Sequence, residues 1–290
     1  MATDLVQSHA WTVKAAEAGD LDAMTVTGID LLNGKSVTVN AEEAIRWLTT
    51  AAEKGDAIAA YELGNVFRGL VVGAPAFRAK PNIARADAAY RKAIAGGSKE
   101  ATDRLAALYE GGLGVEPEWA RAFAIRKPLA DAGDPMSEVY IGLYYERGYG
   151  VPADIKVAAE WFAKSARHGS ARGNFELGRL YFDGEGVPKS EKLAIQYMRQ
   201  AAVQGFPQAL RMMGMILLNG AYGLKNDDVE AEQLIRLAAE KGLPAAAFDL
   251  GEMYLFGTGV EKDRAEARKW FTTCATGGDE RCIAKLKTLS

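Results

Sequence analysis

The chain has 290 residues, of which 49% are hydrophobic, with 35 basic and 38 acidic residues and a formal net charge of −3. This apolar fraction supports a folded core and argues against a disordered chain. The charges are well mixed without a basic stripe, which argues against a nucleic-acid partner. No run approaches the roughly 20 apolar residues that a membrane-spanning helix needs, so we expect no membrane insertion.

The N-terminal segment, MATDLVQSHAWTVKAAEAG, lacks the apolar run and the basic lead of a secretory signal. We therefore expect a cytoplasmic protein, with a periplasmic location as the alternative if a signal peptide has been removed. Within this segment Trp11, Ala15–Ala16 and Gly19 reproduce a pattern that returns later in the chain. Residues 1–20 are therefore predicted to form an N-terminal capping half repeat.

A glycine or alanine, here called the anchor, recurs along the chain at a nearly constant interval. The intervals between anchors are 36, 42, 36, 36, 36 and 37 residues, and the anchors are Gly28, Gly64, Ala106, Gly142, Gly178, Gly214 and Gly251. A fixed period of this length is typical of helical repeat arrays.

Each anchor lies in a segment with helical periodicity. Positions −5, −1 and +3 relative to the anchor carry small, apolar or aromatic residues and are four residues apart, so they share one helical face. The anchor has little or no side chain, which suits the close approach of a neighbouring helix. A glycine six residues after five of the anchors is expected to form a left-handed C-terminal cap: Gly34, Gly148, Gly184, Gly220 and Gly257.

A second helix is predicted after each of these first helices. Four residues precede it as expected N-caps: Asp154, Ser190, Asp227 and Asp263. Large side chains, which we expect in the core, follow at Trp47, Trp161, Tyr197, Leu234 and Trp270. Small residues and a closing glycine end the pattern, and an aromatic residue opposite alanine allows helices to interlock at short distance.

The predicted fold class is therefore all-α, a superhelical solenoid of about seven helix-turn-helix repeats in a single domain over residues 1–290. Such a hairpin cannot bury its apolar face alone and needs a copy of itself alongside. The predicted repeats are 21–56, 57–98, 99–134, 135–170, 171–206, 207–243 and 244–279, and residues 280–290 form a C-terminal capping helix.

Three repeats depart from the pattern. The second carries six extra residues in or near GLVVGAPAFRAKP (69–81), a loop that either is functional or packs on its own hairpin. The third has Ala106 as its anchor and Pro128 in its second helix, where proline should kink or break the helix. The sixth inserts one residue in the turn NGAYGLKNDD.

The pattern A-x-x-x-L-G-x-x-Y-x-x-G-x-G-V…D-x-x-K-A-x-x-W-F-x-K-A-A-x-x-G resembles the Sel-one-like repeat, a relative of the tetratricopeptide repeat. The best copies are residues 137–169, 171–205 and 246–278, and the resemblance covers nearly the whole chain. It implies a helical-hairpin superhelix that binds other proteins. Roles implied by the family include adaptors, partners of virulence factors and bacterial immunity proteins that neutralise toxins.

The two cysteines, Cys274 and Cys282, lie four residues before and four after the closing Gly278. Small residues occupy these slots in other repeats; if they meet across the turn, the two thiols are neighbours with Cα atoms less than about 7 Å apart. The resemblance also implies a disulfide here, because cysteine-rich relatives bridge cysteines at this interval. Two reduced, buried thiols remain the alternative.

The sequence presents no catalytic constellation, so we expect no catalytic residues, no cofactor and no metal ion. The two histidines, His9 and His168, lack partners at ligand spacing and are expected to be solvated at helix ends. The GxGV glycines recur with the repeat period and are turn residues, not a nucleotide fingerprint.

Positions −2, +1 and +5 of the first helices form another stripe, and these positions vary between repeats. We take this stripe as the candidate binding surface on the concave side; a solvated face without constraint is the alternative. From the fourth repeat onward it comprises Tyr140, Leu143, Arg147, Glu176, Arg179, Asp183, Met212, Met215, Asn219, Asp249, Glu252 and Phe256. Arg147 and Arg179 could pair with acidic groups of a ligand, or with Glu176 and Asp183 beside them.

These features favour a non-catalytic scaffold or adaptor that recognises a protein or peptide through its groove, in narrower form a bacterial regulatory or toxin-immunity protein. The alternative is a structural or assembly component of the bacterial cell envelope, in the periplasm. The sequence favours neither a monomer nor an oligomer.

Overall fold

The computed structural model describes residues 2–34, 37–69, 81–111 and 116–289, and these form helices without strands. The helices, in chain order, are α1 (Ala2–Glu17), α2 (Leu21–Asn33), α3 (Ala41–Glu53), α4 (Ala57–Arg68), α5 (Ile83–Ala95), α6 (Lys99–Tyr109), α7 (Trp119–Asp131), α8 (Pro135–Arg147), α9 (Ile155–Arg167), α10 (Ala171–Asp183), α11 (Glu191–Val203), α12 (Pro207–Asn219), α13 (Asp228–Glu240), α14 (Pro244–Phe256), α15 (Arg264–Thr276) and α16 (Glu280–Leu289). The all-α repeat fold is thereby confirmed, with two helices in each predicted repeat.

Local sequence signals set the helix ends. The predicted N-caps of α9, α11, α13 and α15 are confirmed, because each side chain accepts a backbone N–H bond from the first turn. Two first helices lack a side-chain cap and begin instead with Pro207 and Pro244, whose fixed φ suits the first helical position. The five predicted glycine caps all have left-handed φ, between 58° and 76°, a conformation that glycine adopts without strain.

Each anchor glycine receives a large side chain from the second helix of its own repeat. A Cβ atom added to Gly142 would lie 2.5 Å from the Phe162 ring, and one added to Gly251 would lie 2.5 Å from the Phe271 ring. The same contact joins Gly28 to Leu48, Gly64 to Tyr90, Gly178 to Met198 and Gly214 to Ile235. Because these six side chains are fully buried, packing at the anchor offsets the helical cost of glycine, about 1 kcal/mol.

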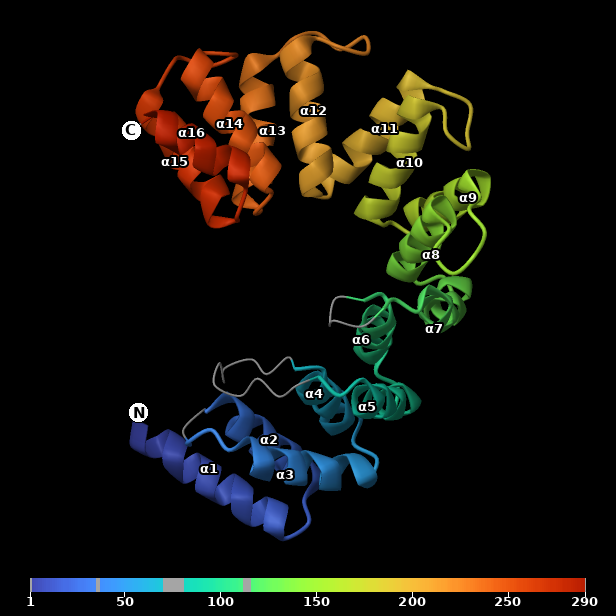
Figure 1. Cartoon of the computed structure of the whole chain (residues 1–290), viewed down its shortest axis with the longest axis vertical. Helices are drawn as coiled ribbons and strands as arrows, with labels where there is room; N and C mark the ends of the chain where they lie inside the picture. The colour runs from blue at the N-terminus through green and yellow to red at the C-terminus, as the bar shows by residue number, and fades with distance from the viewer. Residues whose placement is uncertain (1, 35–36, 70–80, 112–115, 290) are drawn as a thin grey trace. The chain divides into compact units, whose positions relative to one another are not determined.

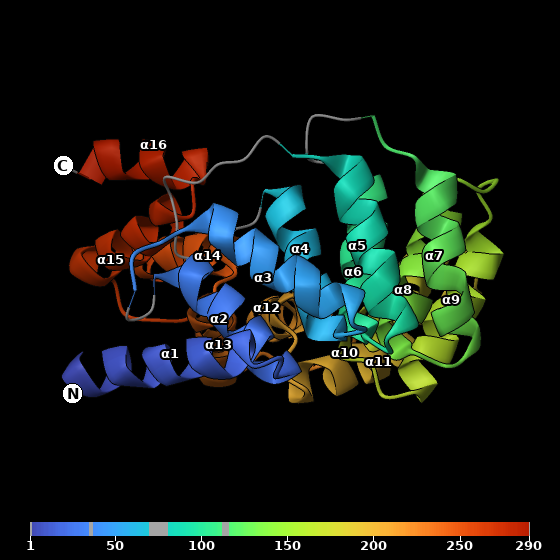
Figure 2. The same cartoon turned by 90° about the horizontal axis from the view of Figure 1, so that it is seen from below.

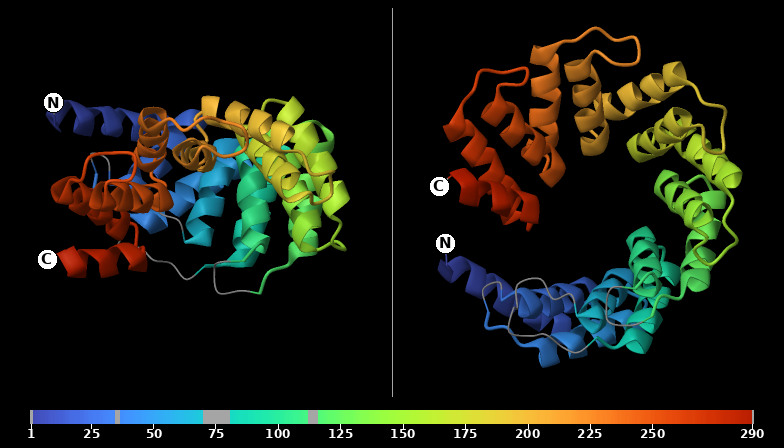
Figure 3. Two further views of the ribbon diagram at one scale, coloured as in Figure 1. Left: turned by 90° about the horizontal axis from the view of Figure 1, so that it is seen from above. Right: turned by 45° about the horizontal axis from the view of Figure 1, so that its top comes forward.

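The chain forms two compact units, residues 1–128 and 129–290. In unit 1, helix α2 packs on both α1 and α3, and α4 packs on α5; Figures 1 and 2 show α1, α2 and α3 side by side. In unit 2 the contacts run from each helix to the next, from α8 to α16. Figure 3 shows these helices following one another in chain order, coloured from green to red. Each unit is thus a stack of helix hairpins.

The large residues predicted for the core are not equally buried. Trp161 and Trp270 are 7% and 5% exposed, whereas Trp47, Tyr197 and Leu234 are only partly buried. Trp11, which occupies the corresponding position of the N-terminal half repeat, is 70% exposed. Helix α1 packs on α2, and the Trp11 side chain points away from that contact into solvent.

The irregular repeats have mixed outcomes. Helix α7 continues through Pro128, so the proline does not break it. Most of the six-residue insertion in 69–81 lies outside the described residues. In the sixth repeat the extra residue lengthens the turn, and Tyr222 adopts a left-handed φ of 55°. Its ring lies 4.8 Å from that of Phe182 in the preceding repeat, a contact that holds the turn in place.

Candidate protein-binding surface

The predicted stripe lies on α8, α10, α12 and α14 of unit 2, and we call its twelve residues the first-helix surface. Arg147, Asp183, Asn219 and Phe256 at the helix ends are exposed. The middle of the surface is partly buried, and Glu176 is only 9% exposed. The side chains therefore do not form a uniformly solvated face.

Ion pairs join the charged residues of this surface to neighbouring repeats. Arg179 contacts Glu146 of the preceding repeat and Glu176 on its own helix, the latter at 3.3 Å. Arg211 donates to Asp249 of the next repeat at 3.2 Å. Lys285 on α16 lies 2.8 Å from Glu252. Of the two alternatives for Arg179, the structure has the pairing with carboxylates of the protein itself. Its charge therefore stabilises the contact between adjacent repeats.

Burial raises the pKa of two carboxylates in these pairs. Loss of hydration raises the pKa of Glu176 above its usual value, although the nearby Arg179 and Arg172 act in the opposite direction. Burial likewise raises the pKa of Asp249 against the hydrogen bond from Arg211. Desolvation therefore offsets part of the stabilisation that each carboxylate gains from its basic partner, as expected for partly buried pairs.

The apolar part of the surface is centred on Met212 and Met215 of the sixth repeat. Both are partly buried: Met215 packs against one core cluster and Met212 against another. Tyr140 lies 5.5 Å from the Arg172 guanidinium, and Phe256, 56% exposed, lies 5.3 Å from the Lys285 ammonium. The sixth repeat thus presents thioethers between two repeats that present paired charges.

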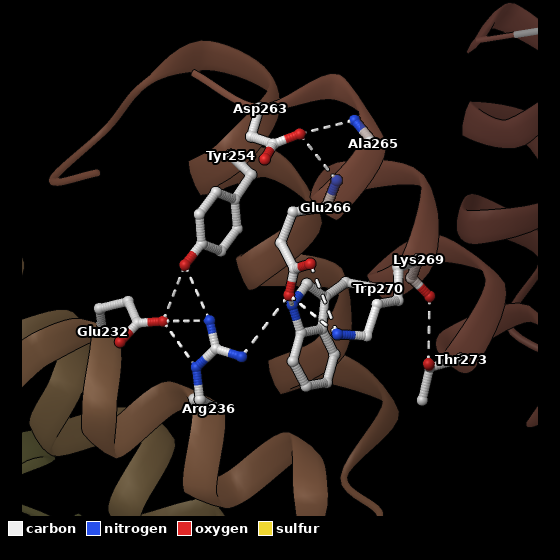
Figure 4. A network of polar contacts seen from close by, with 9 residues as sticks. All are labelled: Glu232, Arg236, Tyr254, Asp263, Ala265, Glu266, Lys269, Trp270 and Thr273. Atoms are coloured by element: carbon white, nitrogen blue, oxygen red, sulfur yellow. Dashed lines mark hydrogen bonds and ion pairs between the residues drawn. The ribbon is translucent and has the colours of Figure 1, made fainter. Parts of the chain in front are cut away.

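A polar network between α13, α14 and α15 was not anticipated from the sequence. Arg236 donates to Glu232 and to the Tyr254 hydroxyl, which in turn donates to the same carboxylate at 3.0 Å. Glu266 accepts from the Trp270 indole at 3.0 Å. Figure 4 shows that these groups point toward one another across the sixth and seventh repeats. These groups satisfy one another's hydrogen bonds, which favours a structural role. The sequence signal for this network was Tyr254, at position +3 from the anchor of the seventh repeat.

The histidine prediction is wrong in part. His9 lies within α1 with its side chain 12% exposed, and its Nδ1 is 3.3 Å from Asp30. His168 does end α9, but its Nδ1 is 2.8 Å from Glu138, whose side chain is 2% exposed. In both cases a carboxylate on a neighbouring helix holds the ring, an interaction between distant residues that spacing along the chain does not reveal.

The Cys274 and Cys282 side chains form a disulfide between α15 and α16, with Cα atoms 5.9 Å apart. Both residues are buried. Asp279 lies close to the two sulfur atoms, but its carboxylate accepts bonds from Arg281 at 3.1 and 2.7 Å. Disulfide sulfur is not a thiolate ligand, so this arrangement holds the last helix in place rather than a metal ion.

Reduction of this disulfide is expected to lower the free energy of unfolding by roughly 2–3 kcal/mol, because the bridge closes a short loop in the unfolded chain. Urea unfolding with and without dithiothreitol measures the loss. The variant C274S/C282S is the control: its stability should match that of the reduced wild type and should not respond to reductant. Equal stability of oxidised and reduced wild type would contradict the prediction.

Among the residues described, no helix is both long and apolar enough to cross a membrane. A profile of the Sel1 repeat matches residues 2–20, 22–56, 99–124, 135–170, 171–206, 207–243 and 244–279. The second repeat, with its insertion, is outside these matches.

Three known proteins show how far the similarity extends. The chain is 35% identical over 83 residues to the chitin synthase regulator SKT5 of Saccharomyces cerevisiae, a match that covers 28% of this chain and only 12% of that protein. A crystal structure of a Sel1 repeat protein from Oxalobacter formigenes has a TM-score of 0.81 and 27% identity, covering 98% of this chain and 81% of the other. An immunity protein from Pseudomonas aeruginosa shares the fold with a TM-score of 0.53 and 22% identity, covering 76% of this chain and 81% of that one. The repeat matches span most of the sequence, and the chain belongs to the Sel1 repeat family.

Proposed function

We propose that this chain is a non-catalytic scaffold that binds a protein or peptide partner through the first-helix surface of unit 2. The observation that carries the proposal is the contrast along this surface: the fifth and seventh repeats bind their charges internally, whereas the sixth presents Met212 and Met215. Methionine adapts to varied partner shapes, and flanking charges favour correct register.

The partner expected here carries an apolar anchor that covers the two methionines. Tyr140 and Phe256, at the two ends of the surface, add aromatic contact area. Aromatic residues are enriched among the few side chains that dominate binding energy at protein interfaces. An extended or helical segment that spans several repeats would contact all four residues.

The test compares captured proteins between the wild-type chain and the variant Y140A/M212A/M215A in extract from its source. A partner that binds this surface should be captured at least tenfold less by the variant, equivalent to about 1.4 kcal/mol. The matched control, K192A/Q196A/Q200A, alters three exposed residues of α11 and should capture normally. Helical circular dichroism confirms folding of both variants. Equal capture by all three baits would refute this binding surface.

In its narrower form the proposal is a bacterial regulatory or toxin-immunity protein with one tight partner. The Pseudomonas aeruginosa immunity protein shares the fold, and its identity of 22% supports no more than that. Purification of the captured partner and titration by calorimetry would identify this form by a single, nanomolar binding event.

A second candidate is an assembly component of the cell envelope in an oxidising compartment. The Cys274–Cys282 disulfide favours it, because such bridges persist mainly outside the reducing cytoplasm. Thiol quantitation on protein isolated from its source without reductant tests it. Two reactive thiols after denaturation would favour the cytoplasmic scaffold, and none would favour the envelope component.

A further inference from the structure

A cleft of about 490 Å³ lies within unit 2 on the second helices, with α11 and α13 as its walls and α12 as its floor. Leu210 and Met213 of α12 form the apolar floor. The first-helix surface contributes none of its twelve residues to this lining, so the cleft is a separate feature.

Unit 1 contains a cleft at the same place in the repeat, between α3 and α5 over α4, with a volume of about 230 Å³. The two linings correspond in register: Glu53 stands where α11 has Val203, and Lys92 stands where α13 has Leu237. The two rim positions are therefore charged in one unit and aliphatic in the other. The repeat architecture forms the cleft, but only the unit 2 version has an apolar rim.

The apolar rim of the unit 2 cleft is open to solvent. Val203 is 89% exposed and Leu237 is 41% exposed, and Leu234 beside them is partly buried. These apolar side chains lie on one concave surface, where contact with a partner would remove them from water. Of the two, Val203 is the more exposed.

Two opposite charges flank these aliphatic residues, with Arg199 on the α11 wall and Glu230 on the α13 wall. Both side chains are exposed, and neither takes part in an ion pair within the described residues. A surface with an apolar centre and opposite charges on its two sides complements itself: a two-fold rotation about an axis along the cleft brings each charge to the opposite one. A different protein would need its own complementary pair of charges to bind this cleft in the same way.

We propose that a second copy of this chain docks on this cleft, with the two-fold axis running along it. In this dimer α11 of one copy faces α13 of the other, and Arg199 of each copy pairs with Glu230 of its partner. Val203 of each copy then lies against Leu237 of the other, so both side chains are covered. The contact is isologous and closes at two copies, so it leaves the first-helix surface free for a different partner.

Charge reversal tests this dimer, because rescue by the double reversal is expected only if Arg199 and Glu230 pair between copies. Sedimentation equilibrium of the full chain should show a monomer–dimer equilibrium. R199E and E230R should each weaken it at least tenfold, because like charges meet twice across the axis. The double variant R199E/E230R should restore it. An equimolar mixture of R199E and E230R should form a heterodimer, since every pair in the mixed dimer is opposite in sign.

The matched control is K92E, a charge reversal at the position in unit 1 that corresponds to Leu237; it should dimerise like the wild type. V203E/L237E should be monomeric with unchanged helical circular dichroism. A wild-type chain that stays monomeric up to about 1 mM, or a mixture of R199E and E230R that fails to associate, would overturn the proposal. Loss of dimerisation with retained partner capture would leave the proposed scaffold function standing, so the two proposals fail independently.

Discussion

Replacement of Phe271 by alanine is expected to lower the free energy of unfolding of unit 2 by about 3–5 kcal/mol. The Phe271 ring is fully buried, lies against the bare Cα of Gly251 and meets the Phe248 ring edge-on at 5.8 Å. Its removal leaves a cavity that fixed helices on both sides prevent from closing. Urea unfolding followed by circular dichroism measures the loss. F256A, the same change at an exposed phenylalanine of α14, should cost about 0.5 kcal/mol or less.

A double-mutant cycle with Gly251 isolates the anchor contact. In the wild type, G251A places a methyl group 2.5 Å from the ring, which costs about 1–3 kcal/mol in overpacking, less about 1 kcal/mol of improved helix propensity. In the F271A background the ring is gone, and the same substitution should stabilise. This change of sign is the expected result. Additive effects of the two substitutions would show that the ring does not pack on the anchor.

The repeat period could be read from the sequence because it is set by local rules that hold in every copy. The caps at Asp154, Ser190, Asp227 and Asp263 and the left-handed glycines depend on neighbours within a few residues, and the structure has them as predicted. The sequence did not reveal which side chain of the second helix packs against the anchor glycine. The sequence drew attention to Trp161 and Trp270, whereas Phe162 and Phe271, one position later, contact the glycine.

The candidate surface was predictable in position but not in its interactions. Spacing placed Arg179 on the stripe and left two possible partners open, and only the arrangement of adjacent repeats brings Glu146 to it. Likewise the contacts of His9 with Asp30 and of His168 with Glu138 join residues 21 and 30 positions apart. Contacts of this length depend on how hairpins stack, which a pattern within one repeat does not specify.

The third repeat shows how one exception to the pattern explains another. Ala106 replaces the anchor glycine, and the residue twenty positions later, where other repeats carry Phe162 or Phe271, is Arg126. Its side chain is 2% exposed, and its guanidinium contacts Asp103 on α6 and, at 3.0 Å, Glu110, the C-cap residue of that helix. A buried cation thus occupies the place of the apolar side chain, held by carboxylates before and after the anchor.

This arrangement predicts opposite outcomes for two kinds of substitution. D103N/E110Q should destabilise unit 1 by about 2–4 kcal/mol, because the guanidinium stays buried while both carboxylates are neutralised; the exposure of Asp103, 55%, keeps the loss from being larger. R126M should cost less than about 1 kcal/mol or stabilise, because an apolar chain of similar volume needs no counter-charge.

Urea unfolding of both variants, with E17Q/E53Q as a control that neutralises two exposed carboxylates of unit 1, gives the comparison. A larger loss for R126M than for D103N/E110Q would mean that the arginine contributes net stability through its charge. The expected order means instead that the third repeat tolerates the cation, and that Asp103 and Glu110 are needed because the cation is there.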